Sequence, residues 1–433
     1  MRVQSTHTYR HVWCLLIGII SLANCEVLAE AVLNEYYSVI AIVAVMNKHY
    51  NVVIIGAGPA GATCALALRK SGLKVALVDK SKFPRNKTCG DAIPGPSLKF
   101  LKEAIEESSE EFKDFELKQR INTSIMYMAN GASIEVNWKS IAYNSTRFSF
   151  DNFLLNLVKK HTSTTVHEGI HIKDISRSGQ TIQFKPRNTN YSISCDMLVG
   201  SDGANSIVSK ALNPDTPDKS TKGVAIRAYY ENVNAPSDAN EFYLLKGFQG
   251  YFWIFPMHDN LYNVGIGTLK DDLVKGFDLK KYFHEVIDSH PVIGEKFKNA
   301  EIKSKVVGFT LPSGGKKMKI SGERFILTGD AAHLVDPLQG HGIDKAIKSG
   351  ILAAQQIERC FNQDNFSSTF IANYDAAIHA SIGKELVRNY RLMRIVRSLP
   401  WLLSVVHPII KNHVDLLMRM FYIRKKPAYH EPQ

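Results

Sequence analysis

Apolar runs along the chain predict a mixed α/β protein. Residues 52–55 (VVII) form an uninterrupted apolar run, and so does the segment that leads into Asp79. Such runs are typical of parallel strands that are buried on both faces. A glycine turn and a helical stretch separate the two runs. This part of the chain therefore predicts a strand–turn–helix–strand unit.

A second pattern is strict alternation. In GYFWIFP (250–256), the side chains of Tyr251, Trp253 and Phe255 occupy every second position, so on a strand they share one face. Phe252 and Ile254 point to the other side. Together with SIMYMANGASIEVNW, this segment predicts a separate sheet. Its aromatic face either packs against helices or lines an apolar binding site.

Composition places the chain among folded globular proteins, because 45% of its 433 residues are apolar and 22% are charged. The net charge of +12 is concentrated near the end: from residue 384 onward there are ten Lys or Arg against three Asp or Glu. Apolar residues are interleaved with this charge in RLMRIVRSLPWLLSVVHPII. The region is therefore predicted to meet a membrane surface rather than nucleic acid.

The first 46 residues stand apart from the rest. The segment VWCLLIGIISLA follows Arg2 and Arg10 and resembles the apolar part of a signal peptide. However, Met46 lies a few residues before the first predicted strand, as an initiator methionine would. Residues 1–46 are therefore interpreted as an extension or a misassigned start, with a targeting or anchor segment as the alternative.

The six cysteines do not form a recognisable framework. None stands in a C-x-x-C pair, and their gaps suit no zinc or iron–sulfur spacing. So few cysteines in a chain of this length also argue against a disulfide framework. The sequence therefore predicts reduced thiols, no metal site and a cytoplasmic location. One of these thiols is Cys89, in the segment KTCGDAIPG.

The turn after the first strand carries a chemical signal. Gly56, Gly58 and Gly61 have the G-x-G-x-x-G spacing. In that motif the first glycine makes the turn, the second lets a pyrophosphate approach the backbone, and the third lets the helix pack closely. Asp79 ends the second strand, where a carboxylate can bind a ribose hydroxyl. The elements occur in the order that a dinucleotide-binding unit requires.

Two later segments indicate which dinucleotide is bound. DMLVGSDGANSIVSK and ERFILTGDAAHLVDPLQGHGIDKAIKSG each place an aspartate in a glycine turn after an apolar strand. With the glycine motif, they resemble the glutathione-reductase-like FAD fold, in the branch of aromatic hydroxylases, halogenases and geranylgeranyl reductases. The resemblance covers about residues 48–360. It implies that FAD is bound by Gly56, Gly58, Ala60, Gly61, Asp79, Lys80, Arg147, Asp202, Gly203, Gly329, Asp330, Gly340, Gly342 and Ile343.

The same resemblance implies distinct roles within this set. Arg147, at the start of a predicted helix, would lie near the FAD phosphates. Asp330 would bind the ribityl hydroxyls. The backbone N–H groups around Gly340 and Gly342 would face the flavin, where a helix N-terminus stabilises negative charge.

Two segments resemble the geranylgeranyl reductase family in particular. KFPRNKTCGDAI is similar to its FPRxKxCGD segment, and GYFWIFP is similar to its YxWxFP pattern, where halogenases show WxWxIP. The resemblance implies that Tyr251, Trp253 and Phe255 bind an apolar isoprenoid substrate. Two features depart from it. Many relatives carry Glu where this chain has His341, and His333 is as hydroxylase-like as reductase-like.

The activity implied is FAD-dependent reduction of carbon–carbon double bonds in a polyprenyl or other isoprenoid lipid, with hydride from flavin N5. NAD(P)H or an electron carrier would be the transient reductant, because no second G-x-G-x-x-G marks a nicotinamide domain. The alkene also needs a proton, and Cys89 and Tyr251 are the candidate catalytic donors. Arg85 and Lys87 are expected to lower the pKa of the Cys89 thiol.

Two alternatives stay open. One is an FAD-dependent monooxygenase, hydroxylase or halogenase that acts on an apolar or aromatic substrate, since these enzymes share the fold. The other is a non-catalytic, membrane-docked protein that only binds flavin or lipid.

The predicted fold is α/β, with a Rossmann-like FAD-binding domain, an inserted β-sheet substrate domain and a helical C-terminal region. The discontinuous FAD-binding domain, within 47–365, is expected to comprise about 47–120, 145–215 and 305–365. The substrate-binding sheet is expected to comprise about 121–144 and 220–304. Residues 366–433 form the basic helical region, through which the protein would sit peripherally on the inner face of a membrane.

Overall fold

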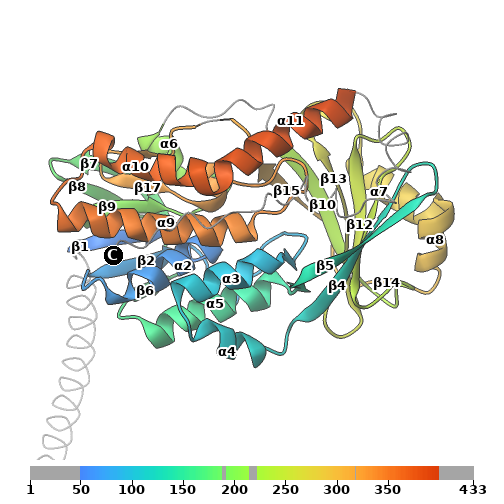
Figure 1. Cartoon of the computed structure of the whole chain (residues 1–433), viewed down its shortest axis with the longest axis horizontal. Coiled ribbons are helices and arrows are strands. Elements are labelled where there is room, and N and C mark those ends of the chain that lie inside the picture. The colour runs from blue at the N-terminus through green and yellow to red at the C-terminus, as the bar shows by residue number, and fades with distance from the viewer. Residues whose placement is uncertain (1–48, 188–191, 214–221, 317, 399–433) are drawn as a thin grey trace, which may run out of the picture.

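Two β-sheets organise the chain (Figure 1). The computed structural model describes residues 49–187, 192–213, 222–316 and 318–398. The predicted N-terminal extension and the part of the predicted membrane-docking stretch from residue 399 onward lie outside the described residues. The predicted α/β class, with its second sheet and a helical segment after residue 366, is confirmed.

The first sheet has β1 at its centre and the strand order β16-β17-β9-β1-β2-β6, with the β7–β8 hairpin beside β9. The strands from β17 to β6 are parallel. Parallel neighbours need crossover connections, which helices supply here. Its strands are β1 (His49–Ile55), β2 (Val75–Asp79), β6 (Thr165–Glu168), β7 (Ile172–Ser178), β8 (Thr181–Pro186), β9 (Ile193–Gly200), β16 (Ser321–Gly322) and β17 (Phe325–Leu327).

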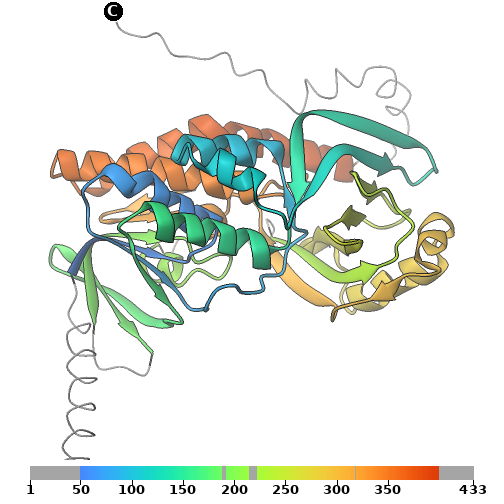
Figure 2. The same ribbon diagram turned by 90° about the horizontal axis from the view of Figure 1, so that it is seen from below.

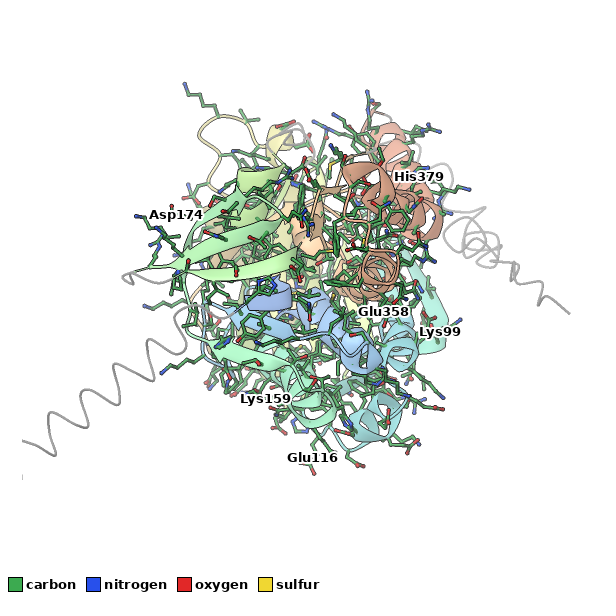
Figure 3. All side chains as sticks on the ribbon, turned by 90° about the vertical axis from the view of Figure 1, so that its left-hand side faces the viewer. Lys99, Glu116, Lys159, Asp174, Glu358 and His379 are labelled. Atoms are coloured by element: carbon green, nitrogen blue, oxygen red, sulfur yellow. The ribbon has the colours of Figure 1, made fainter. Side chains whose placement is uncertain are left out.

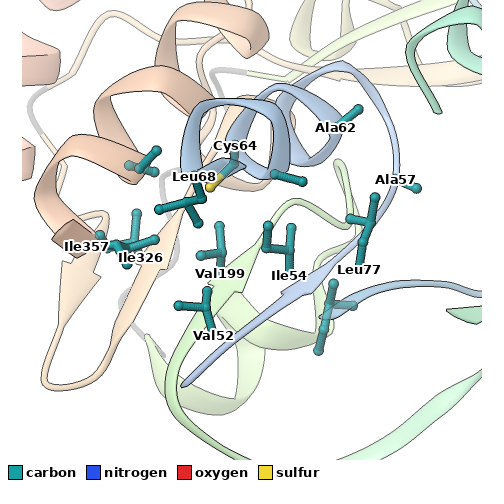
Figure 4. Close-up of a cluster of buried hydrophobic side chains, with 14 of the residues drawn as sticks. Val52, Ile54, Ala57, Ala62, Cys64, Leu68, Leu77, Val199, Ile326 and Ile357 are labelled. Carbon is teal, nitrogen blue, oxygen red and sulfur yellow. The ribbon is translucent and has the colours of Figure 1, made fainter. Parts of the chain in front are cut away.

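Helices pack on this sheet, and α2 runs alongside α9, the longest helix in the described part of the chain (Figure 2). Figure 4 shows the apolar contact beneath α2, where Ile54, Leu77 and Val199 of neighbouring strands lie close to Cys64 and Leu68. The helices of this unit are α2 (Pro59–Ala67), α3 (Gly95–Ala104), α4 (Ser108–Lys113), α5 (Arg147–His161), α6 (Ile207–Leu212), α9 (Ile343–Asn362), α10 (Ser368–Ile378) and α11 (Lys384–Ser398).

The second sheet has the order β14-β10-β13-β12-β11-β4-β5-β3, with β15 paired to β10. Helices α7 (Leu279–Ser289) and α8 (Pro291–Phe297) pack on one of its faces through Phe283 and Ile293. Its strands are β3 (Ala92–Ile93), β4 (Gln119–Tyr127), β5 (Ser133–Asn144), β10 (Lys222–Glu231), β11 (Ala239–Tyr243), β12 (Gly250–Pro256), β13 (Leu261–Leu269), β14 (Glu301–Ile302) and β15 (Val307–Pro312).

The division of the chain between the sheets differs from the sequence prediction at two points. Residues 307–312, expected in the FAD-binding domain, pair with β10 in the second sheet, and residues 92–93 pair with β5. Both segments are short stretches beside loops, and strand pairing over a long sequence distance decided their place. The segment between β2 and β5 therefore crosses from one sheet to the other.

The outer surface of the first unit is charged. Seen end-on in Figure 3, Lys159 of α5 and Asp174 of β7 point away from the layers, and both are exposed. Within the described ranges, no helix combines the length and apolar character that crossing a membrane requires.

The contact between α2 and α9 depends on a glycine. A Cβ atom on Gly350 would lie 2.3 Å from the carbonyl oxygen of Ala60 and 3.0 Å from the backbone nitrogen of Cys64. A backbone neighbour cannot move aside as a flexible side chain can, so the helices would have to separate.

We therefore predict that Gly350→Ala lowers the free energy of unfolding by about 1–3 kcal/mol, the usual cost of overpacking. Urea denaturation would measure it. Gly294→Ala in α8, whose nearest new neighbour would be the Ile287 carbonyl oxygen at 3.3 Å, is the control and should change stability by less than about 1 kcal/mol. Equal stability losses in both variants would contradict the packing argument.

Candidate functional site

Two arginines face the glycine turn at the start of α2. Gly58 is the N-cap of α2 and has no side-chain cap. A Cβ atom at this position would have only two neighbours, the guanidinium nitrogens of Arg147 and Arg85, each at 3.8 Å. The space beside Gly58 is therefore bordered by two cations and a helix N-terminus, an arrangement that favours an anionic group.

Asp151 holds both arginines in place. Its fully buried carboxylate accepts from Arg147 at 2.6 and 2.7 Å and from Arg85 Nη2 at 2.8 Å. Burial raises the pKa of Asp151, but Arg147 and Arg85 outweigh it and hold the pKa below its ordinary value. The Nη1 nitrogen of Arg85 is buried and has no partner in the described part of the chain. One donor thus remains for a phosphate oxygen.

Asp79 lies where the sequence predicts it, at the end of β2. Its two carboxylate oxygens accept from the backbone N–H groups of Ala57 and Ser81, both at 2.8 Å. Each oxygen has a second lone pair, so a ribose hydroxyl could still donate to this group. The neighbouring Lys80 is exposed.

The predicted pair Asp202 and Gly203 follows β9. Asp202 caps α6 by accepting from the backbone N–H of Ile207 at 2.6 Å. Its other oxygen, Oδ1, is buried and has no partner among the described residues. Gly203 has φ +82° and open space where a Cβ would be. This turn thus has a structural role, and its unpaired oxygen is a candidate acceptor for the cofactor.

The third predicted segment brings Asp330 to the loop after β2. Gly329 has φ +56°, a backbone conformation that suits glycine, and its Cβ position lies 3.2 Å from the Cβ of Ala60. Asp330 pairs with Lys87 at 3.3 Å. The glycine turn of α2, the loop after β2 and the segment after β17 therefore meet.

Residues 336–342 form a loop that leads into α9. Asp336, fully buried, accepts from the backbone N–H groups of Leu338 and Gln339 at 2.9 and 2.8 Å, and from the Asn389 amide of α11 at 2.6 Å. Gly342 caps α9 without a side chain, and Ile343 begins the helix. Several N–H groups of the first turn therefore lack intrahelical partners, as the predicted flavin contact requires.

His341 is held within this loop. It contacts Asp344 at 2.9 Å and Gln339 at 3.0 Å. Burial lowers the pKa of His341, but the Asp344 carboxylate outweighs burial and raises the pKa above its ordinary value. Asp344 in turn pairs with the buried Lys345 at 2.8 Å. His341 is therefore part of an ionic network that shapes the loop.

The aromatic face of β12 meets this loop. The Tyr251 hydroxyl donates to the Gln339 carbonyl at 3.0 Å, and it would lie 2.6 Å from a Cβ on Gly340. Trp253 and Phe255 are buried on the same face, whereas Phe252 and Ile254 pack toward α7 and α8. The two-faced strand predicted from alternation is confirmed.

Cys89 lies near both the arginine pair and the aromatic face of β12. Its thiol interacts electrostatically with Arg147 and with Tyr251. Lys87 lowers the pKa of this thiol, as expected, but the net pKa is raised above its ordinary value, which is opposite to the prediction. Desolvation of the half-buried residue raises the thiol pKa, and Arg147 opposes this more than Lys87 does. Arg85 is instead committed to Asp151.

Sequence reasoning missed Asn263 and Gly265 of β13. Asn263 is fully buried, donates to the Cys89 carbonyl at 2.9 Å and accepts from the Trp253 indole at 2.9 Å. A Cβ on Gly265 would lie 2.2 Å from the indole of Trp253. The ring therefore packs directly on the backbone of β13 at Gly265. A signal was present in the sequence, because Gly265 and Gly267 occupy alternate positions within the range 220–304 that was expected to form the substrate-binding sheet.

The residues described above are suited to binding FAD. The anion site at Gly58, the carboxylate of Asp79 and the uncapped start of α9 occur along one edge of the parallel sheet, where dinucleotides bind in such folds. No cluster of three or more His, Cys, Asp or Glu side chains in the described segments is placed to hold a metal ion.

We predict that Gly58→Ala keeps the fold but lowers FAD affinity at least about tenfold, roughly 1.4 kcal/mol. The reason is that φ at Gly58 is −72° and the new Cβ would have no close neighbour until a phosphate approaches. Fluorescence titration of apoprotein with FAD measures affinity. In contrast, Gly61→Ala places its Cβ 1.9 Å from the Gly56 carbonyl and should destabilise the apoprotein itself. Unchanged FAD affinity in Gly58→Ala would exclude this pyrophosphate site.

We also predict that Gly265→Ala destabilises the protein by at least about 1–3 kcal/mol, because the Trp253 ring must leave its place. Near-ultraviolet circular dichroism should change, since the indole environment changes. Gly308→Ala in β15, with its nearest neighbour at 3.4 Å, is the matched control. If Gly265→Ala matched the parent in stability and in its near-ultraviolet spectrum, the inferred ring placement would be refuted.

Comparison with known proteins bears on the cofactor. Over 357 residues, the chain is 27% identical to the digeranylgeranylglycerophospholipid reductase of Methanocella arvoryzae, a match that spans 79% of this chain and 86% of the relative. It is 26% identical over 392 residues to the menaquinone reductase of Mycolicibacterium smegmatis, spanning 84% and 88% of the two chains.

Solved structures share the fold. A geranylgeranyl bacteriochlorophyll reductase-like protein from Thermoplasma acidophilum superposes with a TM-score of 0.70 at 24% identity, covering 80% of this chain and 87% of that one. A flavin-dependent brominase variant superposes with a TM-score of 0.71 at 20% identity, covering 88% and 97%. The predicted resemblance is confirmed. Because the family described as FAD binding domain matches residues 49–382, the chain belongs to that family.

Proposed function

We propose that this protein is an FAD-dependent oxidoreductase that saturates carbon–carbon double bonds of an isoprenoid lipid. The observation that carries the proposal is the meeting of Cys89, Tyr251 and the aromatic face of β12 beside the loop 336–342. Bound reduced FAD would supply the hydride. The side chains described below would supply the proton and the apolar surroundings.

Cys89 is the favoured proton donor. Because desolvation raises its thiol pKa, the group carries its proton at neutral pH. After proton transfer, the thiolate would be stabilised by the nearby Arg147 guanidinium. A neutral acid next to a cation is thus suited to donating a proton once in each cycle.

Tyr251 orients the loop and is the second candidate donor. Its hydroxyl donates to the Gln339 carbonyl, and burial raises its pKa above the ordinary value. A tyrosine that holds its proton this firmly is the weaker acid of the two. We therefore assign Tyr251 first to placing the loop and second to proton transfer.

The aromatic face of β12 would line the binding site for the lipid. The Phe255 ring contacts Phe242 of the neighbouring strand β11, with ring centroids 5.0 Å apart, and Trp253, with ring centroids 6.0 Å apart. Such a surface gains free energy mainly by burying apolar atoms. The names of several relatives, digeranylgeranylglycerophospholipid reductases, support an isoprenoid chain as the substrate class.

We further propose that NAD(P)H or an electron carrier reduces the flavin in a transient complex. We also propose that the protein works peripherally at the inner face of a membrane. The nature of the substrate supports this location, because a long isoprenoid chain resides in the bilayer.

The decisive test is anaerobic. Protein holding FAD, reduced with dithionite, is mixed with a digeranylgeranyl glycerophospholipid in detergent, and the lipid mass is measured. We expect a gain of two hydrogens for each double bond. Turnover only after oxygen is admitted, with oxygen incorporated, would replace the reductase by the monooxygenase alternative. Lipid recovered unchanged in both conditions would favour a binding protein.

We predict that Cys89→Ala and Cys89→Ser bind FAD normally yet reduce lipid at least about tenfold more slowly, because general-acid catalysis is lost. Single-turnover flavin reoxidation by lipid measures the step directly. Cys360→Ala, near the far end of α9, is the control and should keep the parent rate. If Cys89→Ala reduced lipid at the parent rate, Tyr251 would become the assigned donor.

A further inference from the structure

A buried polar cluster lies directly behind Cys89. Its centre is Asp91, which is fully buried and has φ +64°. One carboxyl oxygen, Oδ2, accepts from the Tyr229 hydroxyl at 2.5 Å and from the Asn263 amide at 2.8 Å. The other oxygen, Oδ1, is buried and has no hydrogen-bond partner in the described part of the chain. A carboxyl half-satisfied in this way is costly to bury as an anion.

The cluster is tied to the thiol through the backbone. Cys89 lies two residues before Asp91, and the Asp91 carbonyl accepts from the N–H of Ser145 at 3.0 Å. The Asn263 amide that holds the carboxyl also holds the Cys89 carbonyl at 2.9 Å. Any change at Asp91 is therefore transmitted to the position of Cys89.

Charge also couples the two groups. Asp91 is faced by Tyr229 and Arg227 of β10, by Asn263 of β13, by Arg147 of α5 and by the Cys89 thiol. Burial raises the pKa of Asp91 to about 6, although Tyr229, Arg227 and Asn263 oppose it. In its ionised form, Asp91 raises the pKa of the Cys89 thiol.

We propose that Asp91 is the positioning residue for Cys89: its carboxyl fixes the Cys89 backbone through the Asn263 amide that the two share, and its neutral form makes Cys89 the stronger proton donor. This inference rests on the function proposed above. In this proposal, the hydrogen bonds from Tyr229 and Asn263 hold the Asp91 carboxyl in place.

The charge of Asp91 affects the transfer of a proton from Cys89 to the alkene. The S–H bond of Cys89 breaks, a C–H bond forms on the alkene carbon, and the electron pair stays on sulfur. The positive charge of Arg147 then stabilises the thiolate. With Asp91 ionised, two anions would lie side by side, so the thiolate would cost more. Water afterwards returns a proton to sulfur.

The rate of proton transfer should depend on pH through the protonation of Asp91. A raised pKa means that the neutral carboxyl persists in the folded protein up to about pH 6. Proton transfer should therefore be fastest below that pH and should slow as Asp91 ionises. Removing the Tyr229 donor destabilises the carboxylate, which moves the decline to higher pH.

The test compares the FAD-loaded parent with Asp91→Asn, Tyr229→Phe and the control Tyr230→Phe, whose ring packs on the α7–α8 side. One readout is the pH profile of lipid reduction. The parent should lose activity above about pH 6. Asp91→Asn should lack that decline, and in Tyr229→Phe it should move to higher pH. Tyr230→Phe should match the parent.

A second readout needs no lipid. The rate of iodoacetamide alkylation at Cys89, followed by peptide mass mapping, reports its thiolate fraction at each pH. In Asp91→Asn the alkylation midpoint should fall by about one pH unit, because a neighbouring negative charge is gone.

An unchanged alkylation midpoint, or a decline above pH 6 that persists in Asp91→Asn, would overturn the proposal. So would an equal loss of activity at every pH, since that is the signature of a structural role alone. If the parent itself fails to reduce lipid, the proposed function fails, and the alkylation midpoint still decides whether Asp91 controls Cys89. If Asp91→Asn does not fold, Tyr229→Phe supports or overturns the proposal by whether the decline moves upward.

Discussion

The site depends on one buried carboxylate, that of Asp151. An isolated buried charge costs several kcal/mol, so its two arginine partners are required for stability as well as for binding. One partner, Arg147, comes from the same helix. The other, Arg85, comes from the loop after β2, which is therefore held against α5. Lys87, Cys89 and the segment that enters the second sheet follow directly from that fixed point.

A second constraint acts where the chain passes between the two sheets. Polar groups that are buried there need hydrogen-bond partners. Asn263 provides them for three groups at once: the Cys89 carbonyl, the Asp91 carboxyl and the Trp253 indole. These hydrogen bonds fix the position of Cys89 relative to the aromatic face of β12. The opposite face of β12 is free to form an ordinary hydrophobic core with α7 and α8.

Helix α11 contributes to the site without entering it. The Asn389 amide completes the hydrogen bonding of Asp336, and Glu385 pairs with the buried Lys345 at 3.1 Å. Both contacts stabilise the loop that leads into α9. The solved reductase-like protein and the solved halogenases share the fold of this chain. The chemistry of this chain thus rests on the side chains that these supports hold in place.

The sequence by itself determined the local features of this protein. Glycine spacing and an apolar run specify the strand–turn–helix of β1 and α2, and alternation separates the two faces of β12, because both depend on neighbours within a few residues. Only the tertiary structure decided the acidity of Cys89 and the environment of Asp91. Asn263 and Cys89 are 174 positions apart, and desolvation depends on whatever packs over a group. Burial therefore outweighs the lowering of the Cys89 pKa by Lys87. Arg85 is paired with Asp151, a carboxylate that sequence proximity does not reveal.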